Sequence, residues 1–249
     1  ELLHSLPADR PVRSVHIGLN WTTVCLTSPE GAGPGRCGIA KTLLPPPRPG
    51  HGHAAVEEAG SLHEKSAHQL AALARTPPGP ERSVGWAAIN ALLPVDEKHC
   101  VELNARDFLI KQGRDRKIAI VGHFPFVEAV RPVARSLWVL ELNPAPGDLP
   151  ARQAPEIIPQ ADIVAITSMT LLNGTFEELA GLWRPETLVM MLGPSTPFTP
   201  LLFERGVDVL SGTVIADADR VNRYICQGAS FHQVKGVRLL TLVRDGLAL

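Results

Sequence analysis

The 249-residue sequence has few aromatic residues, few cysteines and a nearly balanced charge. Aromatic residues make up 5% of the chain and include a single tyrosine, so we do not expect a platform that stacks bases. No apolar run reaches the roughly 18 residues that a membrane-spanning helix needs. The net charge of −1 provides no basic surface for nucleic acid or for an anionic membrane. We therefore expect neither partner, while homo-oligomer formation stays open.

The four cysteines, Cys25, Cys37, Cys100 and Cys226, lie far apart and form no C-x-x-C motif. This spacing predicts reduced thiols and a cytoplasmic location rather than a disulfide framework. The chain starts at Glu1, so we expect it to be trimmed, and no signal peptide is visible.

The first part of the chain is predicted to form a small α+β domain. Alternating and β-branched residues indicate strands at residues 12–19 and 21–26, and a third strand is expected at residues 38–44. Helices are predicted at residues 61–74, with Ser61 and Glu64 as a capping box, and at residues 81–93. Strands followed by helices favour the α+β class.

The rest of the chain alternates between apolar strands and helical segments. This order predicts a Rossmann-like, doubly wound parallel sheet of the α/β class. We expect strands at residues 117–122, 136–142, 162–167, 187–193, 207–210 and 237–243, with helices between them, one of them starting at Thr196-Pro197. The predicted domains are residues 1–108, α+β, and residues 109–249, Rossmann-like.

The first strand of this sheet ends at Gly122, and Glu141 follows 19 positions later. Dinucleotide-binding folds place a ribose-binding carboxylate at this distance. The other two glycines of their phosphate-binding turn are replaced by Phe124 and Val127, whose bulk prevents close backbone approach to a pyrophosphate. The pattern supports the fold and argues against NAD as cofactor.

Polar residues follow the predicted strands where these end. Ligands bind at the carboxyl ends of open parallel sheets, near the point where strand order reverses. The predicted ligand-binding residues in this half are His123, Glu141, Asn143, Ser168, Thr170, Asn173, Ser195, Thr196 and Ser211. The alternative is that they cap helices and form turns.

His123 and Glu141 are the predicted metal ligands. His123 is a ligand or a general acid/base near neutral pH, unless it only bonds to the backbone of a turn. Glu141 holds a ribose or a cation, unless it is a structural carboxylate. The chain has no zinc or calcium motif, and His51 and His53 fall in a Pro/Gly-rich loop. A chelate bound through its organic part therefore stays open.

In the first domain, Asn20, Trp21 and Thr22 lie at a strand junction, and Asn90 lies in a helix rich in small residues. We predict that these four also contact the ligand. A hairpin turn and a tie between helices are the structural alternatives.

Several motifs together resemble the prokaryotic putative heavy-metal chelation domain family. They occupy residues 122–126, 141–144, 166–175, 193–197 and 209–212. Residues 18–22, 38–40 and 85–91 resemble the partner module of that family, which has an enolase N-terminal-like fold. The resemblance implies a site between the two modules that binds a heavy metal or a metal chelate. Residues 45–53 depart from the family as an insertion, and Asn20 stands where the family commonly has histidine.

These observations leave three functions open. The first is a small-molecule-binding protein that holds a heavy metal or metal chelate between the two domains. The second is an enzyme acting on a small or nucleotide-like ligand, with His123 as acid/base and Glu141 as anchor. The third is an interaction module. No paired nucleophile supports a covalent mechanism.

Overall fold

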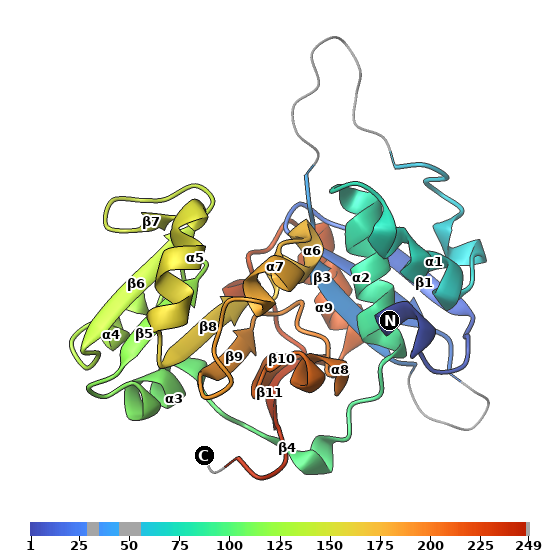
Figure 1. Ribbon diagram of the computed structural model, residues 1–249. Helices are drawn as coiled ribbons and strands as arrows, with labels where there is room; N and C mark the ends of the chain where they lie inside the picture. Colours follow the sequence, from blue (N-terminus) through green and yellow to red (C-terminus); the bar gives the residue numbers. More distant parts are fainter. Residues whose placement is uncertain (29–34, 45–55, 248–249) are drawn as a thin grey trace. The chain divides into compact units, whose positions relative to one another are not determined.

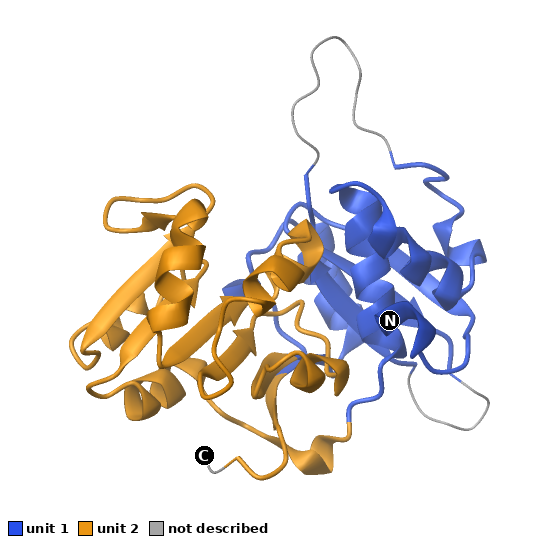
Figure 2. Cartoon of the chain, viewed as in Figure 1, with its two compact units in different colours: residues 1–95, 213–238 blue, residues 96–212, 239–249 orange. Residues whose placement is uncertain are grey.

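The computed structural model describes residues 1–28, 35–44 and 56–247, which form two compact units. Unit 1 comprises Glu1–Val95 and Thr213–Arg238, and unit 2 comprises Asp96–Gly212 and Leu239–Leu249 (Figure 2). Residues 213–238 therefore pack with the start of the chain, although the sequence placed them in the second domain. The domain boundary at residues 108/109 stays a prediction. The histidines at positions 51 and 53 lie outside the described residues.

Unit 1 contains an antiparallel sheet with the order β1-β2-β3, three strands within the described residues. Its elements are η1 (Leu2–His4), β1 (Val12–Ile17), β2 (Trp21–Leu26), β3 (Cys37–Lys41), η2 (Leu62–Glu64), α1 (Ala67–Ala72), η3 (Leu73–Arg75), α2 (Pro80–Leu92), α9 (Ala218–Cys226) and η7 (Phe231–Gln233). The central strand β2 is buried along its whole length, as its β-branched residues Thr22, Thr23 and Val24 favour.

The prediction of reduced thiols is wrong for Cys25 and Cys37, which form a disulfide. The two residues are 12 positions apart in sequence, but they stand directly opposite each other where β2 pairs with β3. Antiparallel pairing brings their Cα atoms to 4.1 Å, so the strand register creates a proximity that spacing along the chain does not reveal. Cys226 is a free thiol, and Cys100 forms no disulfide within the described residues. The cytoplasmic location stays a prediction.

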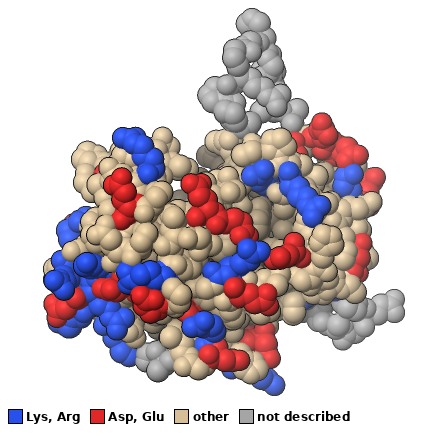
Figure 3. Space-filling view, viewed as in Figure 1, with Lys and Arg blue, Asp and Glu red and all other residues tan. Residues whose placement is uncertain are grey.

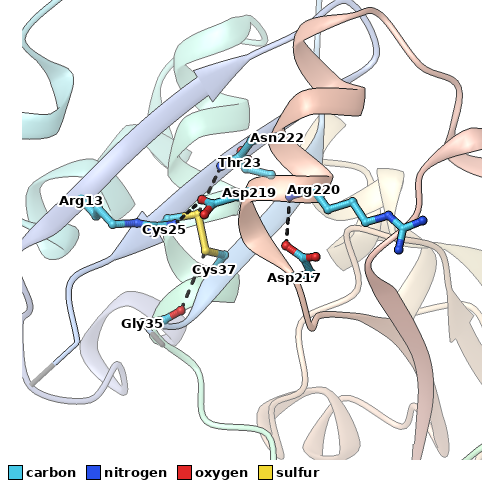
Figure 4. Close-up of a disulfide and its surroundings, with 9 residues drawn as sticks. All are labelled: Arg13, Thr23, Cys25, Gly35, Cys37, Asp217, Asp219, Arg220 and Asn222. Atoms are coloured by element: carbon cyan, nitrogen blue, oxygen red, sulfur yellow. Dashed lines mark hydrogen bonds and ion pairs between the residues drawn. A yellow bond between two sulfur atoms is a disulfide. The ribbon is translucent and has the colours of Figure 1, made fainter. Parts of the chain in front are cut away.

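Helix α9 completes unit 1 from a distant part of the sequence. Val221 and Ile225 of α9 pack in one apolar cluster with Trp21 and Ile39 of the sheet. Beside the disulfide, the hydroxyl of Thr23 donates a hydrogen bond of 2.7 Å to the side-chain amide oxygen of Asn222 (Figure 4). Both partners are buried, so this bond satisfies polar groups that would otherwise be costly.

Helix α2 covers β3 at very short range. A Cβ atom on Gly38 would lie 2.1 Å from the backbone oxygen of Ala87 and 2.3 Å from the backbone nitrogen of Ala91. Only glycine fits at this point of the strand. The small residues noted in the sequence therefore serve helix–sheet packing.

Unit 2 is built on an extended sheet with the order β4-β11-β10-β9-β8-β5-β6-β7 within the described residues (Figure 1). Its strands are β4 (Cys100–Val101), β5 (Lys117–Val121), β6 (Ser136–Glu141), β7 (Leu149–Pro150), β8 (Ile163–Thr167), β9 (Leu188–Leu192), β10 (Val209–Ile215) and β11 (Val237–Val243). The last two strands extend into the segment assigned to unit 1. The strands from β10 to β7 pair in parallel, whereas β4 pairs antiparallel to β11.

The α/β Rossmann-like fold class is confirmed by this sheet. Its central strands are continuously apolar and buried, as parallel strands covered on both faces must be. The chain runs outward from β5 to β6 and β7 and then returns to β8 on the other side of β5. Strand order therefore reverses between β5 and β8.

The remaining elements of unit 2 are short. They are η4 (Glu97–His99), α3 (Ala105–Gln112), α4 (Val127–Val130), η5 (Ala151–Gln153), α5 (Ala154–Ile157), η6 (Ile158–Gln160), α6 (Met169–Asn173), α7 (Phe176–Ala180) and α8 (Leu201–Glu204). Two predicted helix starts are wrong: Ser66, not Ser61, caps α1 by bonding with Gln69, and α8 starts at Leu201 rather than at Thr196-Pro197. In the described part of the chain, no helix has the length and apolarity to cross a membrane.

Candidate functional site

A pocket of about 630 Å³ lies within unit 2, at the carboxyl ends of β5, β6 and β8. This volume is typical of sites that hold small molecules. It borders the place between β5 and β8 where strand order reverses, which is where open parallel sheets bind ligands. Its walls combine apolar side chains, among them Leu140, Met169 and Leu179, with a smaller number of polar groups.

Part of the predicted ligand-binding set lines this pocket. These residues are His123, Glu141, Asn143, Thr170 and Asn173. They come from the ends of β5 and β6 and from α6, so the sheet edge gathers them as expected from the parallel topology. Their contact with a ligand stays a prediction.

Four other predicted residues are not among those that line it: Ser168, Ser195, Thr196 and Ser211. Ser168 is buried against Gly193, where a Cβ atom would lie 2.7 Å from the serine hydroxyl. Ser195 and Thr196 are buried, and the Thr196 hydroxyl finds no hydrogen-bond partner in the part of the chain that the structure describes. Ser211 accepts a hydrogen bond of 3.1 Å from the Thr241 hydroxyl.

The predicted residues of the first domain have structural partners within unit 1. Asn20 donates to the backbone oxygen of Gly228 at 3.0 Å and accepts from Lys41 at 3.1 Å, and that ammonium group lies over the ring of Trp21. The Thr22 hydroxyl bonds with that of Thr42, and Asn90 donates to the backbone oxygen of Ile39. A role of Asn20, Trp21, Thr22 and Asn90 in ligand binding stays a prediction.

The Glu141 carboxylate bonds to the backbone at the pocket wall. One oxygen accepts from the backbone N–H of His123 at 2.7 Å, and the other accepts from the backbone N–H of Leu142 at 3.0 Å. Glu141 therefore links the end of β6 to the end of β5. The carboxylate serves the structure in this way, and its role as a metal ligand stays a prediction.

His123 forms a dyad with an aspartate that the sequence analysis missed. Its ring nitrogen Nδ1 lies 3.0 and 2.9 Å from the two carboxylate oxygens of Asp148. The Asp148 side chain is only 3% exposed, whereas that of His123 is 45% exposed. A carboxylate accepts, so Nδ1 carries the proton and the lone pair is left on Nε2.

The loop between β6 and β7 carries Asp148 to this position. Its carboxylate also accepts the backbone N–H of Ala145 at 3.2 Å, which closes the loop on itself. The segment 145–148 reads Ala-Pro-Gly-Asp, an ordinary turn sequence. Nothing in that pattern distinguishes an aspartate that stabilises a turn from one that orients a histidine.

The donors available for a metal are few. Within the residues that the structure describes, no three His, Cys, Asp or Glu side chains are grouped so that they could hold a metal ion. At the pocket, the lone pair of His123 is free, while both Glu141 oxygens already accept backbone N–H groups. The protein thus offers the His123 nitrogen and the exposed Glu178 carboxylate, which also lines the pocket, rather than a complete coordination shell.

Models of known protein families match both parts of the chain. A family model described as "Putative heavy-metal chelation", DUF364, matches residues 104–244, and a second with the same description, DUF4213, matches residues 1–93. An uncharacterized protein of Methanocaldococcus jannaschii is 28% identical over 165 residues, which are 63% of either chain.

Two crystal structures of proteins with unknown function from the DUF364 family share the fold. The protein from Desulfitobacterium hafniense is 24% identical to this chain and superposes with a TM-score of 0.82. The match covers 98% of this chain and 96% of that protein's chain. The protein from Pyrococcus horikoshii has a TM-score of 0.79 and 18% identity, with the same coverage.

Proposed function

Because the chain belongs to the DUF364 family described as "Putative heavy-metal chelation", we propose that it is a small-molecule-binding protein whose ligand is a metal chelate. The family is the one that the sequence motifs predicted. The proposed ligand lies in the pocket at the carboxyl ends of β5, β6 and β8, with its metal facing His123.

The observation that carries this proposal is the hydrogen bond between His123 and the buried Asp148. Histidines that bind metals usually donate their second ring N–H to a carboxylate, which fixes the tautomer and makes the other nitrogen a better donor. The dyad prepares Nε2 of His123 in this way.

A chelate suits the donor set better than a bare ion. One imidazole nitrogen and one carboxylate cannot complete the coordination shell of a heavy metal, so a chelator has to supply most of the donors. The apolar walls around Leu140, Met169 and Leu179 would bury the organic part of such a complex. His123 would then occupy the coordination position that the chelator leaves open.

The test uses Ni²⁺, Co²⁺ and Zn²⁺, each alone and each as its nitrilotriacetate complex, which leaves coordination positions open. Thermal shifts identify binding to the full chain, and isothermal titration measures the affinity. We expect the complexes to bind more tightly than the ions alone. Asp148→Asn should weaken binding about 10- to 100-fold, the usual effect of losing an outer carboxylate, and His123→Ala should abolish it.

His99→Ala is the matched control. His99 also bonds to an aspartate, Asp96, at 3.0 Å, but both side chains are mostly exposed and neither lines the pocket. This variant should bind like the wild type. Equal affinity of the wild type and His123→Ala for every complex would contradict the proposal.

The same dyad supports a second candidate, an enzyme with His123 as the acid/base and Glu141 as the anchor. A buried carboxylate that holds an imidazole in one tautomer is also the arrangement of a general base. Mass spectrometry of the ligand before and after incubation separates the two functions. A binding protein returns it unchanged, whereas an enzyme converts it.

A further inference from the structure

Arg152 contributes a positive charge to the pocket wall. It lies in η5, directly after β7, and its exposed side chain lines the pocket. Within the described residues, its guanidinium group has no hydrogen bond or ion pair with the protein. Many other arginines of unit 2 do have such partners, for example Arg205 with Glu177 and Arg244 with Asp208.

Several acceptor groups of the pocket are already used by the protein. Both oxygens of Glu141 accept backbone N–H groups. The side-chain oxygen of Asn173 accepts from the backbone N–H and the hydroxyl of Thr175, at 3.1 and 2.8 Å. The Thr167 hydroxyl oxygen accepts from the backbone N–H of Met169 at 3.3 Å.

Two donor groups that line the pocket are available to a ligand. They are the guanidinium group of Arg152 and the amide nitrogen of Asn173, which has no hydrogen bond within the described residues. A planar guanidinium group binds carboxylates and phosphates through two parallel hydrogen bonds. A pocket lined by a guanidinium group without a protein partner favours a ligand that carries a negative charge and hydrogen-bond acceptors.

Glu178 is among the acceptors that the protein leaves available, together with Nε2 of His123. Its carboxylate lines the pocket, is exposed, and has no partner within the described residues. A pocket lined by an acidic and a basic side chain suits a ligand that carries hydroxyl donors in addition to its anionic group. The apolar side chains of Leu140 and Leu142 are available to contact the carbon skeleton between these groups.

We infer that the pocket binds a hydroxylated organic acid with an apolar body, whose anionic group pairs with Arg152. This inference rests on the proposed function and names the class of its chelator: the hydroxyls that bind the metal lie toward His123 and Glu178, and the acid lies toward Arg152. A carboxylate and a phosphate share the required chemistry, so the experiment includes both.

The test compares two pairs of metal-free probes on the full chain by isothermal titration. The first pair is 2,3-dihydroxybenzoate and 2,3-dihydroxybenzamide, which differ in the charge of one group. The second pair is AMP and adenosine. We expect the acid to bind about tenfold or more tightly than its neutral partner. The pair that shows this difference identifies carboxylate or phosphate as the anionic group.

Arg152→Ala should remove the difference between acid and neutral probe, while leaving the weak affinity for the neutral probe unchanged. Arg114→Ala is the matched control, because Arg114 is also an exposed arginine of unit 2 without a partner in the described residues and does not line the pocket. This control should keep the full preference for the acid.

Equal binding of acid and neutral probe by the wild type would overturn the inference, as would a preference for the acid that survives in Arg152→Ala, or no binding of any acid. Metal complexes that bind through His123 under those outcomes would leave the proposed function intact. If Arg152→Ala loses the preference while His123→Ala never affects metal complexes, the acid site stands and the metal-binding proposal fails.

Discussion

At the scale of one residue, the carboxylate of Glu141 stabilises the pocket wall through hydrogen bonds to the backbone. Its two oxygens accept the backbone N–H groups of His123 and Leu142 and so set the distance between the ends of β5 and β6. The pocket wall depends on that distance. A ligand therefore finds the shape of the pocket already fixed before it binds.

Replacing Glu141 by Gln should cost stability. The amide has one acceptor oxygen, so one backbone N–H would face an NH₂ group and lose its bond, at about 1–2 kcal/mol. Urea denaturation measures this loss. Glu128→Gln is the control, because Glu128 is exposed and bonds only to the side chain of Arg131 in the described structure. Unchanged stability of the Glu141 variant would show that these two bonds contribute little.

His16 makes stability depend on pH. Burial, and then the charge of Arg13, lower the pKa of the His16 imidazole below 6.5, and Asp219 opposes them only in part. Its Nδ1 atom is buried and has no partner in the described residues. The unfolded chain therefore binds a proton more readily than the folded chain, and folding is favoured above the unfolded pKa of about 6.5.

We expect the free energy of unfolding to fall as the pH is lowered from about 7.5 to about 5.5. His16→Asn should flatten this part of the profile, because asparagine does not titrate. His99→Asn serves as the comparison, since His99 is an exposed histidine. A profile that keeps its slope in the His16 variant would contradict the assignment.

His123 and Asp148 show which site residues could be predicted from the sequence and which could not. His123 was predicted because it directly follows a buried strand, and the pocket lies there. Asp148 was not predicted, because it is 25 positions away and its turn sequence has a sufficient structural explanation. Arg152 was missed for a similar reason: only the pairing of β7 with β6 brings its segment to the sheet edge. Sequence reveals strand ends more readily than the loops that fold over them.

At the scale of elements, the disulfide joins β2 to β3 within a hairpin-like pair. A cross-link over a separation of 12 residues restricts the unfolded chain and should stabilise unit 1 by about 3 kcal/mol. Cys25 is also fully buried at the centre of the sheet, next to Asn222 of α9. The disulfide therefore stabilises the part of the β2–β3 sheet that contacts α9.

Cys37→Ser should lower stability by roughly this amount, measured in guanidinium chloride without reductant. Adding dithiothreitol should destabilise the wild type to a similar degree and leave the variant unchanged. Cys226→Ser, at an exposed free thiol, should behave like the wild type under both conditions. Equal stability of the wild type with and without reductant would contradict the expected contribution.

Elements of the sheet could be predicted more reliably than helix starts. Strands β5, β6, β8, β9 and β11 lie where the sequence predicted them, and in β5, β8 and β9 burial on both faces demands the continuous apolar run. Thr196-Pro197 has the composition of a helix start, yet α8 begins at Leu201 and Thr196 is buried. Capping residues are also turn residues, and only tertiary packing decides between the two uses.

At the scale of the whole molecule, the chain crosses between the two units more than once. Unit 1 takes residues 213–238 from between two strands of the large sheet. These residues supply Val221 and Ile225 to its apolar cluster and Asn222 to the bond with Thr23. Alternation of strands and helices predicted the fold class from sequence, but this segment continues the same alternation, so the pattern could not show that it packs elsewhere. The face of the molecule in Figure 3 carries Lys and Arg side chains interspersed with Asp and Glu side chains rather than charges of a single sign.

A fragment of residues 1–108, the predicted first domain, should not fold cooperatively, because it leaves the surface that α9 covers exposed to water. Joining residues 1–95 to residues 213–238 through a Gly/Ser linker should restore a cooperative transition. Circular dichroism and thermal melting of both fragments measure this. A sharp melting transition of the 1–108 fragment alone would support the boundary at residues 108/109.

The placement of α9 also has a consequence during synthesis. A ribosome adds roughly 5–20 residues per second, so the first 95 residues leave the exit tunnel on the order of ten seconds before α9 is made. During that interval the apolar face that α9 will cover is available to chaperones and to other nascent chains. The half of the protein that is translated first is therefore completed only near the end of translation.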